Sequence, residues 1–370
     1  MIFIALKNLF QEKTRFLISV SGVAFSVLLI VLLVALYQGW QNRMGEYIRK
    51  LPADFWVGQE GSRDLVHSMS VLPTSDLEKV RKIPGVSRAV SFTGRQIEAS
   101  INGEDERIFV VGYDPSAGIG GPLKVVEGKS YPSSSEIIVD RVFAKNKKLK
   151  IGDEIPIGGT EFEIVGISEG GNLVIFQYLF VTIEDAEKIF RLKDLTNYLM
   201  VNISPEADKT AVLSEIRRAI GGGSEIFSRD TFVKNNTKIV TETFLPIILV
   251  LVVIGFIVGV TVIGLTIFTS TIEKSREYGV LKAIGVKNSQ LYLIVVEQAL
   301  IAGVIGFFVG VFLAFAINSL VGRFVPEFIT QFRIFDFAWI SIATLIMAVL
   351  AAFVPIRRLA NINPAEVFKS

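Results

Sequence analysis

Four long apolar runs dominate this 370-residue sequence, and each is almost free of charged residues. They cover residues 16–37, 244–269, 291–320 and 337–354. A helix needs about 20 apolar residues to cross the hydrocarbon core of a bilayer, which is about 30 Å thick. The mean hydropathy of +0.51 is also higher than is usual for a soluble protein. The sequence therefore predicts an α-helical membrane protein with four transmembrane helices.

Lysine and arginine residues flank these runs unevenly. They are frequent before the first run, between the second and third runs, where Lys274 lies, and after the fourth run, where Arg357 lies. The short loop between the third and fourth runs carries only Arg323 and Arg333. Because basic flanks stay on the cytoplasmic side, we expect both termini in the cytoplasm. The long segment 41–243 is then extracytoplasmic.

This long segment is much more polar than the four runs, and it carries both helix and strand signals. Asn102 and Gly103 lie between two runs of alternating apolar residues, a pattern typical of a β-hairpin. Ser75 and Glu78 have the spacing of a capping box, which predicts the start of a short helix. Together these signals predict a mixed α+β extracytoplasmic domain between the first and second transmembrane helices.

The composition excludes several kinds of chemistry. The chain has no cysteine and a single histidine, His67, so thiolate catalysis and metal sites built from several histidines are ruled out. The net charge of +2 argues against nucleic-acid binding. The nearest match to a nucleotide-binding P-loop is Gly128, Lys129 and Ser130, but Leu123 replaces the first glycine of that motif. We therefore expect no catalytic, cofactor or metal site in this chain.

Ionisable residues are nearly absent from the apolar runs. The exception is Glu297, near the start of the third run, which indicates either a contact between helices or a role in moving a proton or substrate. Small residues recur at four-residue spacing as Gly255 with Gly259, and Gly306 with Gly310. Such pairs let helices approach closely. They indicate either packing within one chain or a dimer interface.

The connection between the second and third runs, residues 271–290, begins with a dense group of charges. Val280, Leu281 and Ile284 then form a small apolar stripe at helical spacing, and Gly285 ends the segment. This pattern is typical of a short amphipathic helix at the membrane surface. Such a helix either docks in a groove of a cytoplasmic partner or rests on lipid.

The connection resembles the permease family that includes FtsX, MacB and the Lol lipoprotein-release permeases. Residues 276–285 follow that family's pattern Arg-Glu-Tyr/Ile-Gly-x-Leu/Arg-x-Ala-Ile/Val-Gly, and residues 278–285 are similar to the DevC-like exporter branch. Residues 8–15, the outer segments within 137–167, and Asn-Pro-Ala-Glu-Val at 363–367 also resemble segments of the family. The resemblance covers essentially the whole chain.

The resemblance implies the permease subunit of an ABC-type transporter, which is not itself an enzyme. Two permease chains, expected to form a homodimer, would pair with two copies of a separate cytoplasmic ATPase, which would bind ATP and Mg²⁺. A periplasmic adaptor protein is a further expected partner. ATP-driven closure of the ATPase would move the outer domains by mechanotransmission. The result would be export or extraction of a lipid, lipoprotein, peptide or similar substrate.

The resemblance also assigns roles along the chain, which is expected in the inner or plasma membrane. The connection would be the coupling helix that contacts the ATPase. The residues expected to form that contact are Glu273, Arg276, Glu277, Tyr278, Gly279, Leu281, Lys282, Ala283, Ile284 and Gly285. The implied segments are a cytoplasmic amphipathic segment (1–15), transmembrane helix 1 (16–40), a MacB-like core domain (41–243, with a strand-rich lobe at about 124–182), transmembrane helix 2 (244–270), the coupling helix (271–290), transmembrane helix 3 (291–320), an outer loop (321–336), transmembrane helix 4 (337–355) and a cytoplasmic tail (356–370).

Two other functions are weighed against this one. The first is an FtsX-like transmembrane regulator whose outer domain activates a cell-wall hydrolase, but the usual FtsX outer domain is much smaller than segment 41–243. The second is a membrane-anchored enzyme with its active site in the outer domain. The missing catalytic constellation counts against that reading.

Overall fold

The computed structural model describes residues 12–66, 69–173, 176–322, 324–325 and 328–360. His67, Arg323, the first eleven residues and the Asn-Pro-Ala-Glu-Val motif lie outside the described residues. The chain divides into two compact units. The membrane unit comprises Met1–Gly39 and Thr243–Ser370, and the outer unit comprises Trp40–Glu242.

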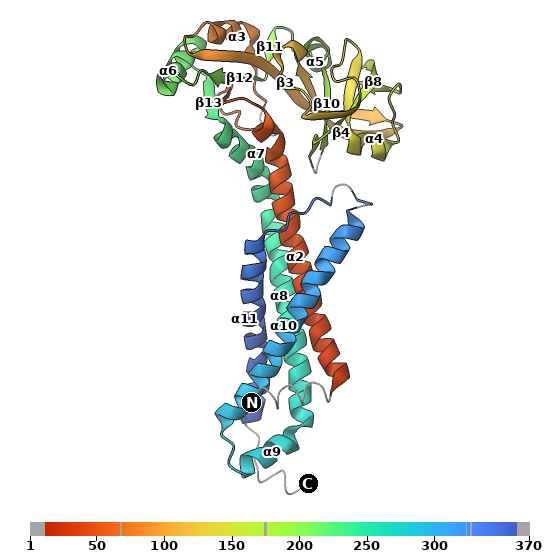
Figure 1. Ribbon diagram of the computed structural model, residues 1–370, viewed down its shortest axis with the longest axis vertical. Coiled ribbons are helices and arrows are strands. Elements are labelled where there is room, and N and C mark those ends of the chain that lie inside the picture. Colours follow the sequence, from red (N-terminus) through yellow and green to blue (C-terminus); the bar gives the residue numbers. More distant parts are fainter. Residues whose placement is uncertain (1–11, 67–68, 174–175, 323, 326–327, 361–370) are drawn as a thin grey trace. The chain divides into compact units, whose positions relative to one another are not determined.

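Four helices in the described part of the chain are long and apolar enough to cross a membrane. They are α2 (Lys13–Lys50), α8 (Leu245–Glu273), α10 (Asn288–Val321) and α11 (Ile334–Ala360). Within the membrane unit they run alongside one another (Figure 1). The predicted fold class, with four membrane helices and a mixed α/β domain between the first and second, is confirmed. Helix α2 continues well beyond the predicted end at residue 40, and its residues after Gly39 belong to the outer unit.

Close approach between the membrane helices depends on glycine. A β-carbon built on Gly306 would lie 2.5 Å from Cβ of Val23, and one built on Gly310 would lie 2.6 Å from the carbonyl oxygen of Ala24. Helix α10 therefore packs almost backbone to backbone against α2. The other pair belongs to α8, where Gly255 faces α2 and Gly259 faces both α2 and Met347 of α11. Gly259, Gly306 and Gly310 thus lie at close approaches within one chain and Gly255 at an ordinary contact, while a role in a dimer interface stays a prediction.

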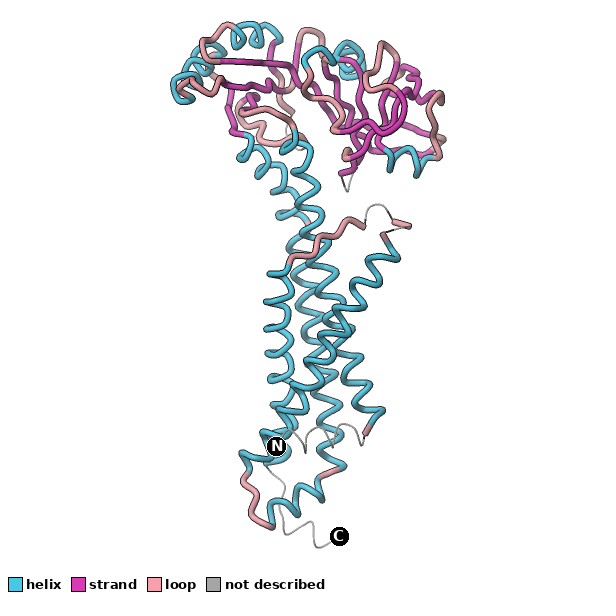
Figure 2. Tube along the Cα trace, in the orientation of Figure 1, coloured by secondary structure: helices cyan, strands magenta, loops and turns pink. Residues whose placement is uncertain are grey.

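The outer unit contains an eleven-stranded sheet, drawn as magenta segments in Figure 2. Two further strands, β2 and β11, form a small sheet of their own. All the described strands are β1 (Phe55–Gln59), β2 (Leu72–Pro73), β3 (Val86–Ile101), β4 (Glu104–Tyr113), β5 (Lys124–Gly128), β6 (Glu136–Asp140), β7 (Glu154–Ile157), β8 (Thr160–Glu169), β9 (Asn172–Leu173), β10 (Phe176–Thr182), β11 (Leu195–Thr196), β12 (Tyr198–Ile203) and β13 (Ser224–Ser228). Their order is β13-β1-β12-β3-β4-β10-β6-β8-β5, with β7 beside β8 and β9 beside β10, while β2 and β11 pair separately.

Helices and one 3₁₀ turn cover this sheet or connect its strands. They are α3 (Thr74–Arg81), η1 (Pro115–Ala117), α4 (Arg141–Lys147), α5 (Ile183–Phe190), α6 (Lys209–Ile220) and α7 (Arg229–Thr243). Two clusters of mainly aliphatic buried side chains result among the described residues, apart from a group of buried aromatic rings that includes Trp56, Phe92 and Phe232. One is built around β1, β12, α3 and α6, and the other around β4, β6, β8, β10 and α5. The long strand β3 serves both, since Ala89 lies in the first core and Ile101 in the second.

Two local predictions for the outer unit have different outcomes. The hairpin at Asn102 and Gly103 is confirmed: Ile101 pairs with Glu104, and both turn residues have positive φ, as a two-residue type I′ turn requires. The capping box at Ser75 is wrong. Helix α3 begins one residue earlier, at Thr74, and its N-cap residue, Pro73, makes no side-chain cap. The first helical N–H, that of Thr74, instead donates to the carbonyl of Asp194, because β2 pairs with β11 at this point.

We expect Gly310→Ala to destabilise the membrane unit by about 1–3 kcal/mol, because the added methyl group would press on a backbone oxygen of α2. Thermal unfolding of the purified protein in a single detergent measures this loss. Gly255→Ala is the matched control, since its β-carbon would meet Leu29 at an ordinary separation of 3.4 Å. Equal unfolding temperatures for the two variants would contradict the packing assigned to α10 and α2.

Candidate functional site

The connection between α8 and α10 forms a separate short helix, α9 (Ser275–Ala283). A single residue, Lys274, separates α8 from α9. It is the C-cap of α8 and the N-cap of α9, and we call it the elbow. At the other end, Gly285 has φ +97° and lies just after the last turn. Its N–H donates to the carbonyl of Lys282, and the N–H of Val286 donates to that of Leu281. This is the Schellman arrangement, in which a left-handed glycine ends a helix.

The inward side of α9 is fixed to the membrane helices. Tyr278 is only 3% exposed and belongs to the same hydrophobic core as the buried residues of α2, α8, α10 and α11, and Leu281 packs against that core. The ammonium of Lys282 donates to the carbonyl oxygens of Leu359 at 2.8 Å and Ala360 at 3.1 Å. These are the last carbonyls of α11, where the helix dipole favours a cation. Partial burial lowers the pKa of Lys282.

The outward side of α9 is not covered by other described parts of this chain. Its exposed residues are Arg276, Glu277, Val280, Ala283 and Ile284. Their spacing places them on one face of the helix. The face is charged near its start and apolar near its end, where Ile284 is 73% exposed. An exposed apolar end beside charged residues is the kind of surface that a helix presents to a protein groove.

The structure thus divides the residues predicted for the coupling contact into separate groups. Four of them face outward, namely Arg276, Glu277, Ala283 and Ile284. Leu281, by contrast, is half-buried and packs against its own membrane unit, to which the buried Tyr278 also belongs, and Gly279 is buried as well. Gly285 ends the helix and is itself exposed.

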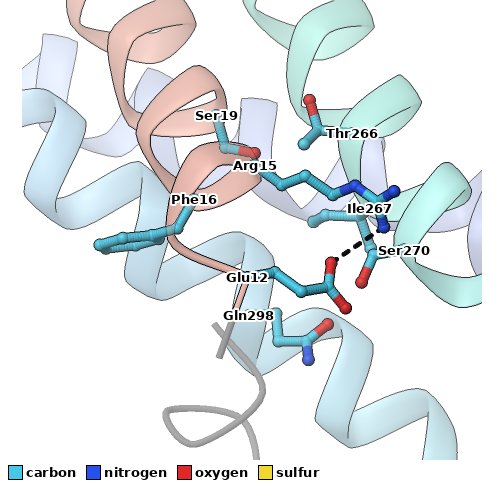
Figure 3. Close-up of a pocket in the computed structure, with 8 residues that line it drawn as sticks. All are labelled: Glu12, Arg15, Phe16, Ser19, Thr266, Ile267, Ser270 and Gln298. Carbon is cyan, nitrogen blue, oxygen red and sulfur yellow. Dashed lines mark hydrogen bonds and ion pairs between the residues drawn. The ribbon is translucent and has the colours of Figure 1, made fainter. Parts of the chain in front are cut away.

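A group of ion pairs joins the start of α2 to the elbow, and Figure 3 shows its pair between Arg15 and Glu12. The guanidinium of Arg15 donates to the carboxylate of Glu12 at 3.0 Å and also pairs with Glu273. The ammonium of Lys274 lies 3.2 Å from the other oxygen of Glu12. Of these residues, Glu273 was predicted for the coupling contact and Lys274 as a basic flank, but the ion pairs themselves were not predicted. The three-residue spacing of Glu12 and Arg15 beside an apolar run was the signal that could have revealed part of it.

A small cavity of about 20 Å³, large enough for about one water molecule, lies beside these ion pairs. Besides Glu12 and Arg15 it is lined by residues of α8 and by Gln298 of α10 (Figure 3). The neighbouring Glu297 is half-buried, and the structure describes no hydrogen-bond partner for its Oε2 atom. No described residue forms an ion pair with Glu297, so its role as an interhelical contact stays a prediction. No group of three or more potential metal ligands occurs among the described residues.

These features define a class of protein in which a four-helix membrane unit carries one large α/β domain and one anchored surface helix. Residues 16–219 match the model of the MacB-like periplasmic core domain, and residues 239–364 match that of the FtsX-like permease C-terminal domain. The chain belongs to the MacB- and FtsX-type family of ABC transporter permeases, as its sequence motifs indicated. It is therefore a membrane protein with an extracytoplasmic domain, and such a permease implies a cytoplasmic ATPase partner.

Relatives of known sequence agree with this assignment. An uncharacterized ABC transporter permease of Methanocaldococcus jannaschii is 25% identical over 99% of this chain and 96% of its own length. The macrolide export ATP-binding/permease protein MacB of Escherichia coli is 22% identical over 97% of this chain, which spans 59% of that longer protein. The crystal structure of the periplasmic region of MacB from Actinobacillus actinomycetemcomitans is also similar, with 13% identity and a TM-score of 0.39 over 51% of this chain and 95% of that one.

We expect Tyr278→Ala to loosen α9 from the membrane unit, because it removes a buried ring worth about 3 kcal/mol in packing. Hydrogen exchange followed by mass spectrometry measures the effect as faster exchange across residues 275–283. Ile284→Ala is the matched control, since its side chain is exposed and its removal leaves the anchoring contacts in place. Slow exchange in both variants would show that Tyr278 does not hold the helix.

Proposed function

We propose that this chain couples ATP hydrolysis by a separate cytoplasmic ATPase to movement of its own extracytoplasmic domain. The observation that carries the proposal is the two-sided character of α9: its inner side is anchored to the membrane helices, and its outer side is exposed. The basic residues near Lys274 and Arg357 support a cytoplasmic position for α9 and for both termini. A cytoplasmic ATPase with a groove for α9 meets a helix already fixed at its base.

The anchoring contacts explain how a push on α9 reaches the membrane helices. Lys282 ties the helix to the end of α11, and Tyr278 ties it to the shared core. The elbow residue Lys274 joins α9 directly to α8, and its ion pair with Glu12 reaches the start of α2. Movement of α9 therefore acts on several membrane helices together. We propose that this motion is transmitted to the outer domains by mechanotransmission.

The proposed assembly has two permease chains, as a homodimer, and two ATPase copies that bind ATP and Mg²⁺. A lipid, lipoprotein, peptide or similar molecule is the proposed substrate, and an adaptor protein on the outer side is a further proposed partner. In support, the Escherichia coli relative is named as a macrolide exporter, and it joins an ATP-binding part and a permease part in one protein. In the described middle turns of α8, α10 and α11, nearly all side chains are apolar, which suits transmission of motion better than an ion pathway.

We expect Glu277→Lys and Ile284→Asp to reduce substrate-stimulated ATP hydrolysis at least tenfold in the reconstituted complex. Both changes alter the exposed face of α9 and leave its anchors intact, so the chain should still insert in the membrane. Steady-state ATPase activity in proteoliposomes is the measurement. Lys287→Ala, an exposed change beyond the end of α9, is the control and should keep normal activity. Normal stimulated activity in both face variants would rule out α9 as the coupling element.

A further inference from the structure

We propose that a groove in the outer unit binds an amphipathic anion, a phosphate or carboxylate joined to a small apolar body. The groove has a volume of about 350 Å³ and lies where the end of α2 meets the loop between β4 and β5. All its lining residues belong to the Trp40–Glu242 unit. Volumes of about 300–1,000 Å³ are typical of small-molecule sites. None of the residues proposed for coupling on α9 lines this groove.

The charge of the groove selects an anion. Among the described residues that line it, Lys50 and Lys124 are the charged ones, and none is acidic. Each lysine has a carboxylate neighbour outside the lining: Lys50 pairs with Glu46 at 2.6 Å, and Lys124 lies 3.5 Å from Glu169. Both ammonium groups are exposed, and ion pairs at exposed positions contribute little stability. A ligand anion can therefore take over as their partner at small cost.

The remaining lining selects an apolar body attached to that anion. Tyr131 is 59% exposed and lines the groove, so its ring is available to a ligand. Tyr113 stands beside it, with Leu123 and Val125 along the same groove. Tyrosine rings offer apolar surface to a ligand together with a hydroxyl group that can bind its polar part. The hydroxyl of Tyr113 donates to the carbonyl of Ser130 across a long distance of 3.5 Å, so a ligand oxygen can replace this weak contact.

The floor of the groove is held in place before any ligand binds. The hydroxyl of Tyr47 donates to the carbonyl of Gly120 at 2.6 Å, and this carbonyl belongs to the β4–β5 loop. The ring of Tyr47 is fully buried, with its centroid 4.5 Å from that of Tyr178. Gly120 itself has φ +96°, a conformation that other residues adopt only with strain. A preformed floor lowers the entropy that a ligand must lose on binding.

The idea that the groove binds the transported substrate rests on the proposed function. The idea that the groove binds an amphipathic anion does not, because binding requires no ATPase and no ATP. A failed binding test would therefore leave the coupling role of α9 untouched. Likewise, a failed ATPase test would leave the groove as a ligand site.

The test is binding of hexyl phosphate to the full chain in dodecyl maltoside, followed by ³¹P line broadening, since this detergent contains no phosphorus. We expect Lys50→Gln combined with Lys124→Gln to weaken binding at least tenfold, and Tyr131→Ala to weaken it about threefold. Lys193→Gln, an exposed lysine outside the groove, is the matched control and should bind like the unaltered chain. All variants change exposed residues, and equal unfolding temperatures will show that each remains folded.

Competition with hexanoate identifies the anion. Equal displacement shows a site for carboxylates as well as phosphates, and failure to displace shows a site for phosphate esters; both results support an amphipathic anion. Equal affinity for inorganic phosphate would show that the apolar part contributes nothing, and equal affinity for hexyltrimethylammonium would show that the charge contributes nothing. Either result, or unchanged binding in the double lysine variant, would overturn the proposal.

Discussion

The anchoring of α9 is the interaction on which this account of the molecule depends. A nine-residue helix at a membrane surface would transmit little force if it lay loosely on lipid. Here the ring of Tyr278 is buried in the core of the membrane unit, and the ammonium of Lys282 donates to the last two carbonyls of α11. The same nine residues leave a complete helical face exposed. Fixing one side and exposing the other is what the proposed contact with an ATPase requires of a connection between two spans.

The two units solve different physical problems with different residues. In the membrane unit, where lipid is as apolar as the side chains, helices gain contact by bringing backbones close together at Gly306 and Gly310. In the outer unit, two hydrophobic cores share the long strand β3, which makes them parts of one continuous sheet. The groove at the end of α2 belongs to this second unit, and its floor is fixed by Tyr47. The proposed coupling contact and the proposed ligand site thus use separate sets of residues.

Much of this arrangement could be predicted where a signal is local and strong. The apolar runs predicted four spans, and Asn102 with Gly103 predicted a hairpin, because each pattern permits few alternatives in its environment. The direction of Leu281 could not be predicted, because helical spacing places a residue on a face but does not say what that face meets. The prediction of a capping box at the start of α3 was wrong for a related reason. Strands β2 and β11 are distant in sequence, and their pairing brings the carbonyl of Asp194 to the N–H of Thr74. The ion pairs of Glu12 with Lys274 likewise join residues far apart in the chain.

The central claim is that this permease works with a separate ATPase. Purification of the chain from its native membrane in mild detergent, followed by quantitative mass spectrometry, tests that claim most directly. The account predicts recovery of a P-loop ATPase at equal stoichiometry with this chain. Recovery of the chain without an ATPase, under conditions that preserve a known ABC complex, would contradict it.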